Sequence, residues 1–311
     1  QTNNTPGTLL LVFCSILLHA SMAHAQTAQD YLIGRGSADI TGPAFGVQMW
    51  GFGRPDQIVE GIHTRQRARA FVIAQVDDPA RTLVFVAADL GSIDHHMTLA
   101  VVERLQQRFG NRYNLDNVIL SATHTHSAPG GYWQTRSPTG LDGGLYPQYF
   151  DAIVAGITAA ILQAHDDLQP GTIFINSGHV ANAGANRSAV AYLENPPQER
   201  ARYSEVTNTE MLLLKFVDDS GEIGVLNWYA LHPTAMNFYN HLISGDHKGY
   251  ASLQMERQQG ATYQSADDFV AAFAQLNWEA PLDTPAGDYR LTHFGYDNIG
   301  NAFSGVSQVI Q

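Results

Sequence analysis

Two histidines, His124 and His126, lie two positions apart in the segment VILSATHTHSAPGG, residues 118–131. Residues i and i+2 of an extended chain point to the same side, so both imidazoles can face one cavity. Neutral imidazole nitrogens bind zinc, and histidines also transfer protons in general acid–base catalysis. A polar loop with two solvated histidines has the same spacing, so the pattern leaves open a metal site, a catalytic site and a structural loop.

A third histidine, His232, follows the apolar run GVLNWYA, residues 224–230, after a single leucine, Leu231. A catalytic zinc ion takes ligands from different elements and keeps one position open for water. His124 and His232 each follow a buried strand and could supply two such ligands. The chain has no HExxH segment and a single cysteine, so the common protease and cysteine-cluster zinc patterns do not apply. A buried histidine held by hydrogen bonds remains the alternative for each position.

The elements that must position these histidines follow an α/β order. Apolar runs predict strands over 81–90 and 117–122, and helical spacing over 97–109 lies between them. A longer amphipathic helix is predicted over 146–165, and a hairpin over 211–230. We therefore predict an α/β fold with a mixed β-sheet and flanking helices, in an α/β/α-like arrangement.

Further elements are predicted on both sides of this unit. Strands are expected over 31–41, 62–75, 172–177 and 269–275, and helices over 250–258 and 297–310. In the helix 97–109, Leu99, Val102 and Leu105 are expected to face inward. Residues 186–203 show neither helical nor strand periodicity and are predicted to form a structured loop.

Composition limits the class of protein. The 311 residues include 44% hydrophobic and only 15% charged residues, which is typical of a globular domain with a sizeable core. The formal net charge is −12, and no basic stripe is present to neutralise phosphates. Non-specific nucleic-acid binding is therefore excluded as a function.

The N-terminal residues 1–25 have the pattern of an export signal. An apolar run over 9–18 is too short to span a bilayer, and Ala23-His24-Ala25 gives a small-x-small cleavage pattern before Gln26. We expect a secreted or periplasmic protein without a transmembrane segment in the mature chain. The only cysteine, Cys14, lies in the signal, so no disulfide is expected in the mature protein.

Four segments occur in an order that narrows the function: ATHTHSAPGGY, NRSAVAYLENPPQERARY, WYALHPTAMN and LISGDHKGYAS. Together they resemble the neutral ceramidase (neutral/alkaline nonlysosomal ceramidase) family, in the N-terminal part of its catalytic domain, over roughly residues 31–275. The resemblance implies a zinc-dependent amidase that hydrolyses the N-acyl bond of ceramide to sphingosine and a fatty acid. It also implies a ceramide-like substrate and peripheral contact with a membrane or micelle surface.

The resemblance also implies roles for five residues. His124 and His232 match the family's zinc ligands. His126 and Arg187 match active-site residues that are expected to orient the scissile amide or stabilise its oxyanion. Gly51 matches a glycine that lines the substrate entrance.

The chain departs from the family pattern near its end. Leu282 stands where family members have a serine with a catalytic role, and the family's further zinc ligands, a glutamate and a tyrosine, fall beyond Gln311. We therefore expect residues 26–311 to be an incomplete catalytic domain with weak zinc binding and impaired activity. The alternatives are a non-catalytic or vestigial lipid-binding member of the family, and a different metal-dependent hydrolase whose altered segment is 276–286.

Overall fold

A computed structural model of the chain describes residues 31–133, 144–275, 292–296 and 302–306. Its helices are α1 (His95–Phe109), α2 (Pro147–Asp166), α3 (Ala189–Leu193), α4 (Pro197–Arg200) and α5 (Asp246–Gln258), with a 3-10 turn η1 (Gly110–Arg112). Its strands are β1 (Tyr31–Asp39), β2 (Gly61–Ile62), β3 (Arg67–Gln75), β4 (Thr82–Ala88), β5 (Val118–Ala122), β6 (Gln169–His179), β7 (Glu210–Asp218), β8 (Gly221–Tyr229), β9 (Leu242–Ile243), β10 (Val270–Gln275), β11 (Thr292–Tyr296) and β12 (Ala302–Val306).

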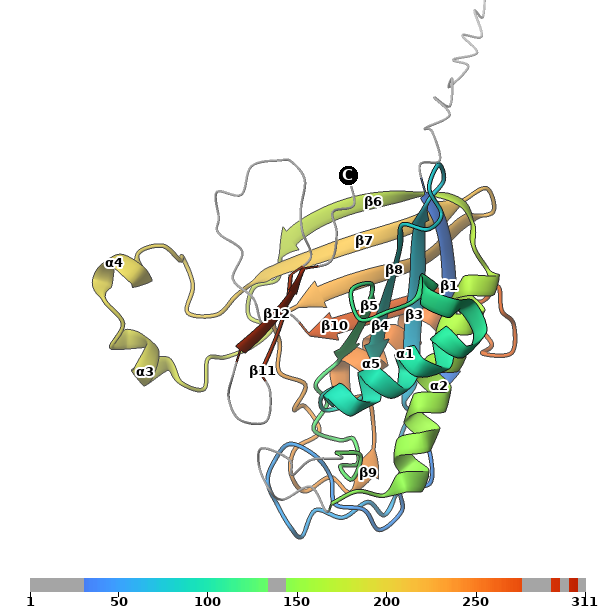
Figure 1. The fold of residues 1–311 in the computed structure, drawn as a ribbon. Helices are drawn as coiled ribbons and strands as arrows, with labels where there is room; N and C mark the ends of the chain where they lie inside the picture. The colour runs from blue at the N-terminus through green and yellow to red at the C-terminus, as the bar shows by residue number, and fades with distance from the viewer. Residues whose placement is uncertain (1–30, 134–143, 276–291, 297–301, 307–311) are drawn as a thin grey trace, which may run out of the picture.

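Eight of these strands form one sheet in the order β10-β8-β7-β6-β1-β3-β4-β5 (Figure 1). The pairs β4/β5 and β8/β10 are parallel, and the other neighbours are antiparallel. The mixed sheet with flanking helices confirms the predicted fold class. The hairpin predicted over 211–230 is the antiparallel pair β7/β8.

Helices α1 and α2 cover the half of the sheet formed by β1, β3, β4 and β5 (Figure 1). Alternate residues of β3 and β4, such as Val72 and Val86, pack with buried residues of the two helices, such as Leu105 and Ile157. Burying these apolar side chains is the main stabilising term for such a layer. Among the described helices, none combines the length and the apolar character that a bilayer crossing requires.

The sheet folds over on itself, so that its two halves form separate layers. The opposite faces of β3 and β4 pack against β7, β8 and β10. Phe71 lies 4.4 Å from Phe216, and Phe85 lies 5.3 Å from Trp228, measured between ring centroids. Helix α5 packs on β10, where Met255 contacts a small cluster on the outer side of β8 and β10. Helices therefore lie outside both halves of a folded sheet.

Three expectations about local structure were wrong. Leu99 is 39% exposed, and Met97 and Val101 face inward instead, because Leu99 lies two positions from Met97 and so on the other side of the helix. Residues 186–203 contain α3 and α4, which are too short for a periodic pattern. A helix was predicted over 297–310, but residues 302–306 within it form strand β12, which pairs with β11. The Ser, Gly and Val of this strand are poor helix formers.

A buried group of charges joins β3 to α5 across this fold. The Arg69 guanidinium binds the Glu256 carboxylate at 2.6 Å and the Asp89 carboxylate at 3.0 Å, with all three side chains at most 2% exposed. Burial alone would lower the pKa of Arg69, but the two neighbouring carboxylates raise it. Glu256 also accepts hydrogen bonds from the Tyr263 hydroxyl and the Ala271 amide.

Replacing Arg69 by methionine is expected to lower the free energy of unfolding by about 3–5 kcal/mol, because two carboxylates are left buried without a counter-ion. The matched control is Lys215→Met, which breaks the exposed ion pair with Glu222 and should cost about 1 kcal/mol or less. Urea unfolding measures both values. Equal losses in the two variants would contradict the structural role given to the buried charges.

Candidate functional site

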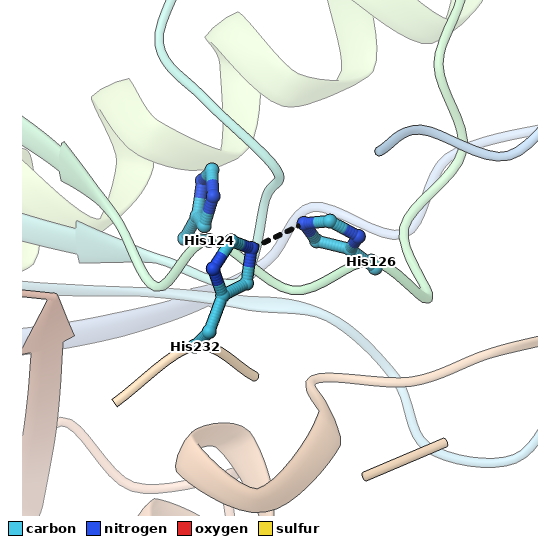
Figure 2. Close-up of side chains that lie close together, drawn as sticks. All are labelled: His124, His126 and His232. Atoms are coloured by element: carbon cyan, nitrogen blue, oxygen red, sulfur yellow. Dashed lines mark hydrogen bonds between the residues drawn. The ribbon is translucent and has the colours of Figure 1, made fainter. Parts of the chain in front are cut away.

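The three predicted histidines converge from opposite halves of the folded sheet. His124 and His126 follow the end of β5, and His232 follows the end of β8. One ligand atom of each imidazole lies within 4.8 Å of the others. Figure 2 shows the three rings gathered around one point. The convergence predicted from two strand ends is therefore confirmed, with His126 as a third member.

His124 is fixed in one orientation and one tautomer. Its backbone has a left-handed φ of +70°, which is uncommon for a residue other than glycine. Its amide donates to the Leu90 carbonyl, and its Nδ1 lies 2.7 Å from the Gly91 carbonyl oxygen. Because a carbonyl only accepts, Nδ1 carries the proton and Nε2 keeps its lone pair. His124 thus presents a free nitrogen to the other two rings.

His126 and His232 contact each other directly. Their Nε2 atoms are 2.7 Å apart, which is the dashed contact in Figure 2. At this distance one nitrogen donates a proton to the other, so neither of these two nitrogens has a free lone pair in this arrangement. The His126 side chain is buried, and its Nδ1 has no hydrogen-bond partner in the described part of the chain.

All three imidazoles are held neutral. Burial lowers the pKa of His124 to about 4. Burial, together with the charge that His124 would carry, lowers the pKa of His126 to about 3. The pKa of His232 is also lowered, first by burial and then by the charge of Arg187. At neutral pH the site therefore offers uncharged nitrogen donors, the form in which histidine binds metals.

Arg187 lies close enough for its positive charge to act on all three histidines. Its side chain is exposed, and it forms no ion pair within the part of the chain that the structure describes. The positive charge of this predicted site residue therefore helps to keep the three imidazoles neutral.

Aromatic side chains of the glycine-rich loop pack against the histidine rings. Trp50 meets His124 and His126 edge-on at 5.0 and 5.3 Å, and Phe52 meets His126 at 4.7 Å between ring centroids. Phe52 in turn meets Phe238 edge-on, at 6.1 Å between ring centroids. These contacts surround the His124 and His126 rings with apolar side chains.

Gly51 is the point of closest approach between this loop and the site. Its φ is +107°, and a Cβ placed there would lie 2.6 Å from Cγ and Nδ1 of His126. Any side chain would therefore displace the imidazole. This contact places Gly51 beside the ring of His126.

Lys248 is a residue that the sequence did not single out. Its Nζ donates to the carbonyls of Tyr229 at 2.7 Å and Ala274 at 3.0 Å, and to the Gln275 side chain. Burial lowers its pKa to about 7. Because the three acceptors use all three ammonium donors, Lys248 ties together the ends of β8 and β10, just before His232. No spacing in the sequence signals this role.

The family described as neutral/alkaline non-lysosomal ceramidase, N-terminal, matches residues 31–280. The chain belongs to this ceramidase family. A neutral ceramidase of Oryza sativa subsp. japonica is 45% identical over 262 residues, which cover 83% of this chain and 32% of that protein. A neutral ceramidase of Pseudomonas aeruginosa is 42% identical over 271 residues, which cover 87% of this chain and 39% of that protein.

Solved structures agree with this assignment to the ceramidase family. The crystal structure of the Pseudomonas aeruginosa neutral ceramidase matches with a TM-score of 0.74 and 41% identity, covering 82% of this chain and 41% of that chain. A ceramidase complexed with C2 matches with a TM-score of 0.73 and 43% identity, covering 79% of this chain and 37% of that one. The chain thus spans about a third of the length of the curated relatives it matches.

The predicted site residues of this ceramidase chain divide into two groups. His124, His126 and His232 form one cluster, Gly51 lies against the His126 ring, and the charge of Arg187 lowers the pKa of the three imidazoles. Leu282, at the position of the family serine, and the export signal 1–25 lie outside the described residues.

Substituting Gly51 by alanine is expected to displace the His126 ring and to lower the free energy of unfolding. Gly46→Ala is a matched control, because Gly46 also has a positive φ of +79° but no described atom lies within 4 Å of its Cβ position. Backbone strain should lower the free energy of unfolding of each variant by about 1–2 kcal/mol. The clash with His126 should lower that of Gly51→Ala further. Urea unfolding and NMR of ¹⁵N-labelled histidines measure the two effects. Unchanged His126 resonances in Gly51→Ala would show that the loop does not press on the ring.

Proposed function

We propose that this chain carries the histidine centre of a zinc-dependent amidohydrolase that cleaves the N-acyl amide of ceramide to sphingosine and a free fatty acid. The observation that carries the proposal is the group of three neutral imidazoles within 4.8 Å of one another. The names of the ceramidase relatives support ceramide as the substrate.

The donors present suit a zinc ion. His124 offers a free Nε2 whose tautomer is set by Gly91, and imidazole nitrogen is a preferred ligand of zinc. We assign His124 and His232 as the metal ligands, and His126 as the residue that faces the substrate, because the resemblance to the ceramidase family implies these roles for the three positions. Metal binding at His232 would replace its hydrogen bond with His126. When bound, zinc lowers the pKa of its water towards neutrality and polarises a carbonyl oxygen.

His126 and Arg187 are assigned to the reacting amide. The His126 Nδ1 is buried and unpartnered among the described residues, so this ring has a second nitrogen available to move a proton. The Arg187 guanidinium can donate hydrogen bonds to the carbonyl oxygen of the substrate. Donors aimed at the oxygen where charge develops stabilise the transition state more than the ground state.

The hydrocarbon chains of the substrate would follow an aromatic path. Ring contacts run from His126 to Phe52, then to Phe238 and Tyr239. Tyr239 is 72% exposed, and Phe45, on a loop next to Val59, is 81% exposed. We assign these two side chains to a peripheral contact with the membrane or micelle surface that holds the lipid, as expected for exposed aromatic groups at an interface.

A second candidate is a lipid-binding member of the family without catalytic activity. It is favoured by Leu282 at the position of the family serine.

We assign export, to the medium or the periplasm, from the signal pattern of residues 1–25. Recovery of the protein only inside the cell, with residues 1–25 still attached, would contradict that assignment.

The hydrolase proposal is tested with a fluorescent N-acylsphingosine in detergent micelles. We expect slow release of the labelled fatty acid above the protein-free control, because Leu282 replaces the family serine. A chelator should stop the release and added zinc should restore it. His124→Ala and His232→Ala should release no more than the protein-free control, whereas His95→Ala, a change at an exposed position of α1, should leave the rate unchanged.

The same experiment separates the two candidates. Ceramide binding by calorimetry, together with no release of fatty acid in excess zinc, would contradict the hydrolase and support the lipid-binding alternative.

The double variant Phe45→Ser, Tyr239→Ser is expected to reduce the sedimentation of the protein with phosphatidylcholine vesicles, because it removes the two exposed aromatic side chains assigned to that contact. Leu115→Ser is the matched control. Leu115 is 52% exposed and precedes β5, so it lies at the opposite end of that strand from His124. Equal sedimentation of the double variant and the wild type would contradict the proposed membrane contact.

A further inference from the structure

The segment 244–247, which joins β9 to α5, contacts both loops that carry the histidines. On one side it meets the loop of His124 and His126. The Thr125 hydroxyl donates to the Ser244 carbonyl at 2.9 Å, and the Ser244 amide donates to the Ser127 carbonyl at 2.9 Å. This side of the segment is therefore hydrogen-bonded to the residues directly before and after His126 in the sequence, Thr125 and Ser127.

On the other side, Asp246 holds the loop of His232. The Asp246 carboxylate accepts hydrogen bonds from two consecutive amides of that loop, from Ala235 at 3.1 Å and from Met236 at 2.9 Å. The next residue, His247, places its Nε2 3.2 Å from the His232 carbonyl oxygen. The loop after β8 is thus tied to the same short segment as the loop after β5.

The conformation of Asp246 indicates that its position is strictly required. Its side chain is buried, with 3% of the residue exposed, and its φ is +53°. A left-handed backbone costs free energy at a residue other than glycine, and a buried carboxylate needs its hydrogen bonds. The contacts with the amides of Ala235, Met236 and His247 supply those bonds, and charge-assisted bonds of this kind are strong.

We propose that Asp246 is a positioning residue that sets the placement of His232 opposite His124 and His126. It acts through the backbone of the loop 232–236, and no contact with an imidazole is assigned to it. The importance of Asp246 for catalysis rests on the proposed function, in which the nitrogens that Asp246 helps to place bind the metal ion. An Asp246→Asn change replaces one carboxylate oxygen with an NH2 group. That group is a donor and cannot accept the hydrogen bond of a loop amide, so the loop is released.

The test uses Asp246→Asn, with Asp246→Ala as a stronger second variant. Asp268→Asn is the matched control. Asp268 also accepts hydrogen bonds from two consecutive backbone amides, those of Thr262 and Tyr263. It precedes β10, which runs parallel to β8, so it lies at the opposite end from His232.

Three quantities are measured for each variant: urea unfolding, the ¹⁵N resonances of the histidines in the metal-free protein, and zinc affinity by competition with a chelator. We expect Asp246→Asn to shift the His126 and His232 resonances and to weaken zinc binding by about 10–100-fold, the usual effect of losing a residue that supports a ligand. Asp268→Asn should keep the histidine resonances and bind zinc within about twofold of the wild type. The loss of stability of Asp268→Asn gives the free-energy cost of removing a carboxylate that accepts hydrogen bonds from two backbone amides.

Wild-type histidine resonances and wild-type zinc affinity in a folded Asp246→Asn would overturn the proposal. If Asp246→Ala does not fold, Asp246→Asn decides alone. If the wild type itself binds no zinc, the proposed function fails, and the histidine resonances of the metal-free variants still decide the role of Asp246.

Discussion

The packing of the two halves of the sheet against each other is the constraint on which the site depends. Six inter-strand spacings separate β5 from β8 in the order of the sheet, which would amount to about 29 Å in a flat sheet. The rings of His124 and His232 are nevertheless 4.5 Å apart. The buried contacts of Phe71 with Phe216 and of Phe85 with Trp228 hold the folded form in which these strand ends meet.

The electrostatic character of the site follows from that burial. Burial removes the hydration of an imidazolium, which favours the neutral form of the buried His126 and of the half-buried His124. His232 is more exposed, and the charges of Arg187 and Lys248 add to the lowering of its pKa. The charge of Lys248 acts on His124 and His232 in the same direction, and the charge of Arg187 acts on all three rings. Deprotonated nitrogen donors close together are what a metal ion requires. The folded sheet therefore determines the chemistry as well as the geometry.

The local elements were largely predictable from the sequence, because their apolar patterns are long. The continuous apolar runs predicted β4 and β8, and the hairpin β7/β8 was predicted from its turn. The folding of the sheet over itself was not predictable, because it depends on contacts between residues such as Phe85 and Trp228 that lie far apart in sequence. Short elements such as α3 fall below the length at which periodicity can be recognised.

The candidate site was predicted in part. The HTH spacing and the histidine after β8 indicated a shared cavity, and the family resemblance added Arg187 and Gly51. No sequence pattern indicates the contacts that hold the site residues in place. The Gly91 carbonyl that orients His124 is a backbone atom, and Lys248 acts through three acceptors from distant segments. Such contacts exist only after the chain has folded.

X-ray absorption at the zinc edge of the zinc-loaded protein reports the atoms bound to the ion, and so tests whether the histidine cluster is the metal centre. We expect a shell with imidazole nitrogens at about 2.0–2.1 Å, which is lost when His124 and His232 are both replaced by alanine. A shell of oxygen atoms alone, or a spectrum that is unchanged in the double variant, would contradict the assignment of this histidine cluster as the metal centre.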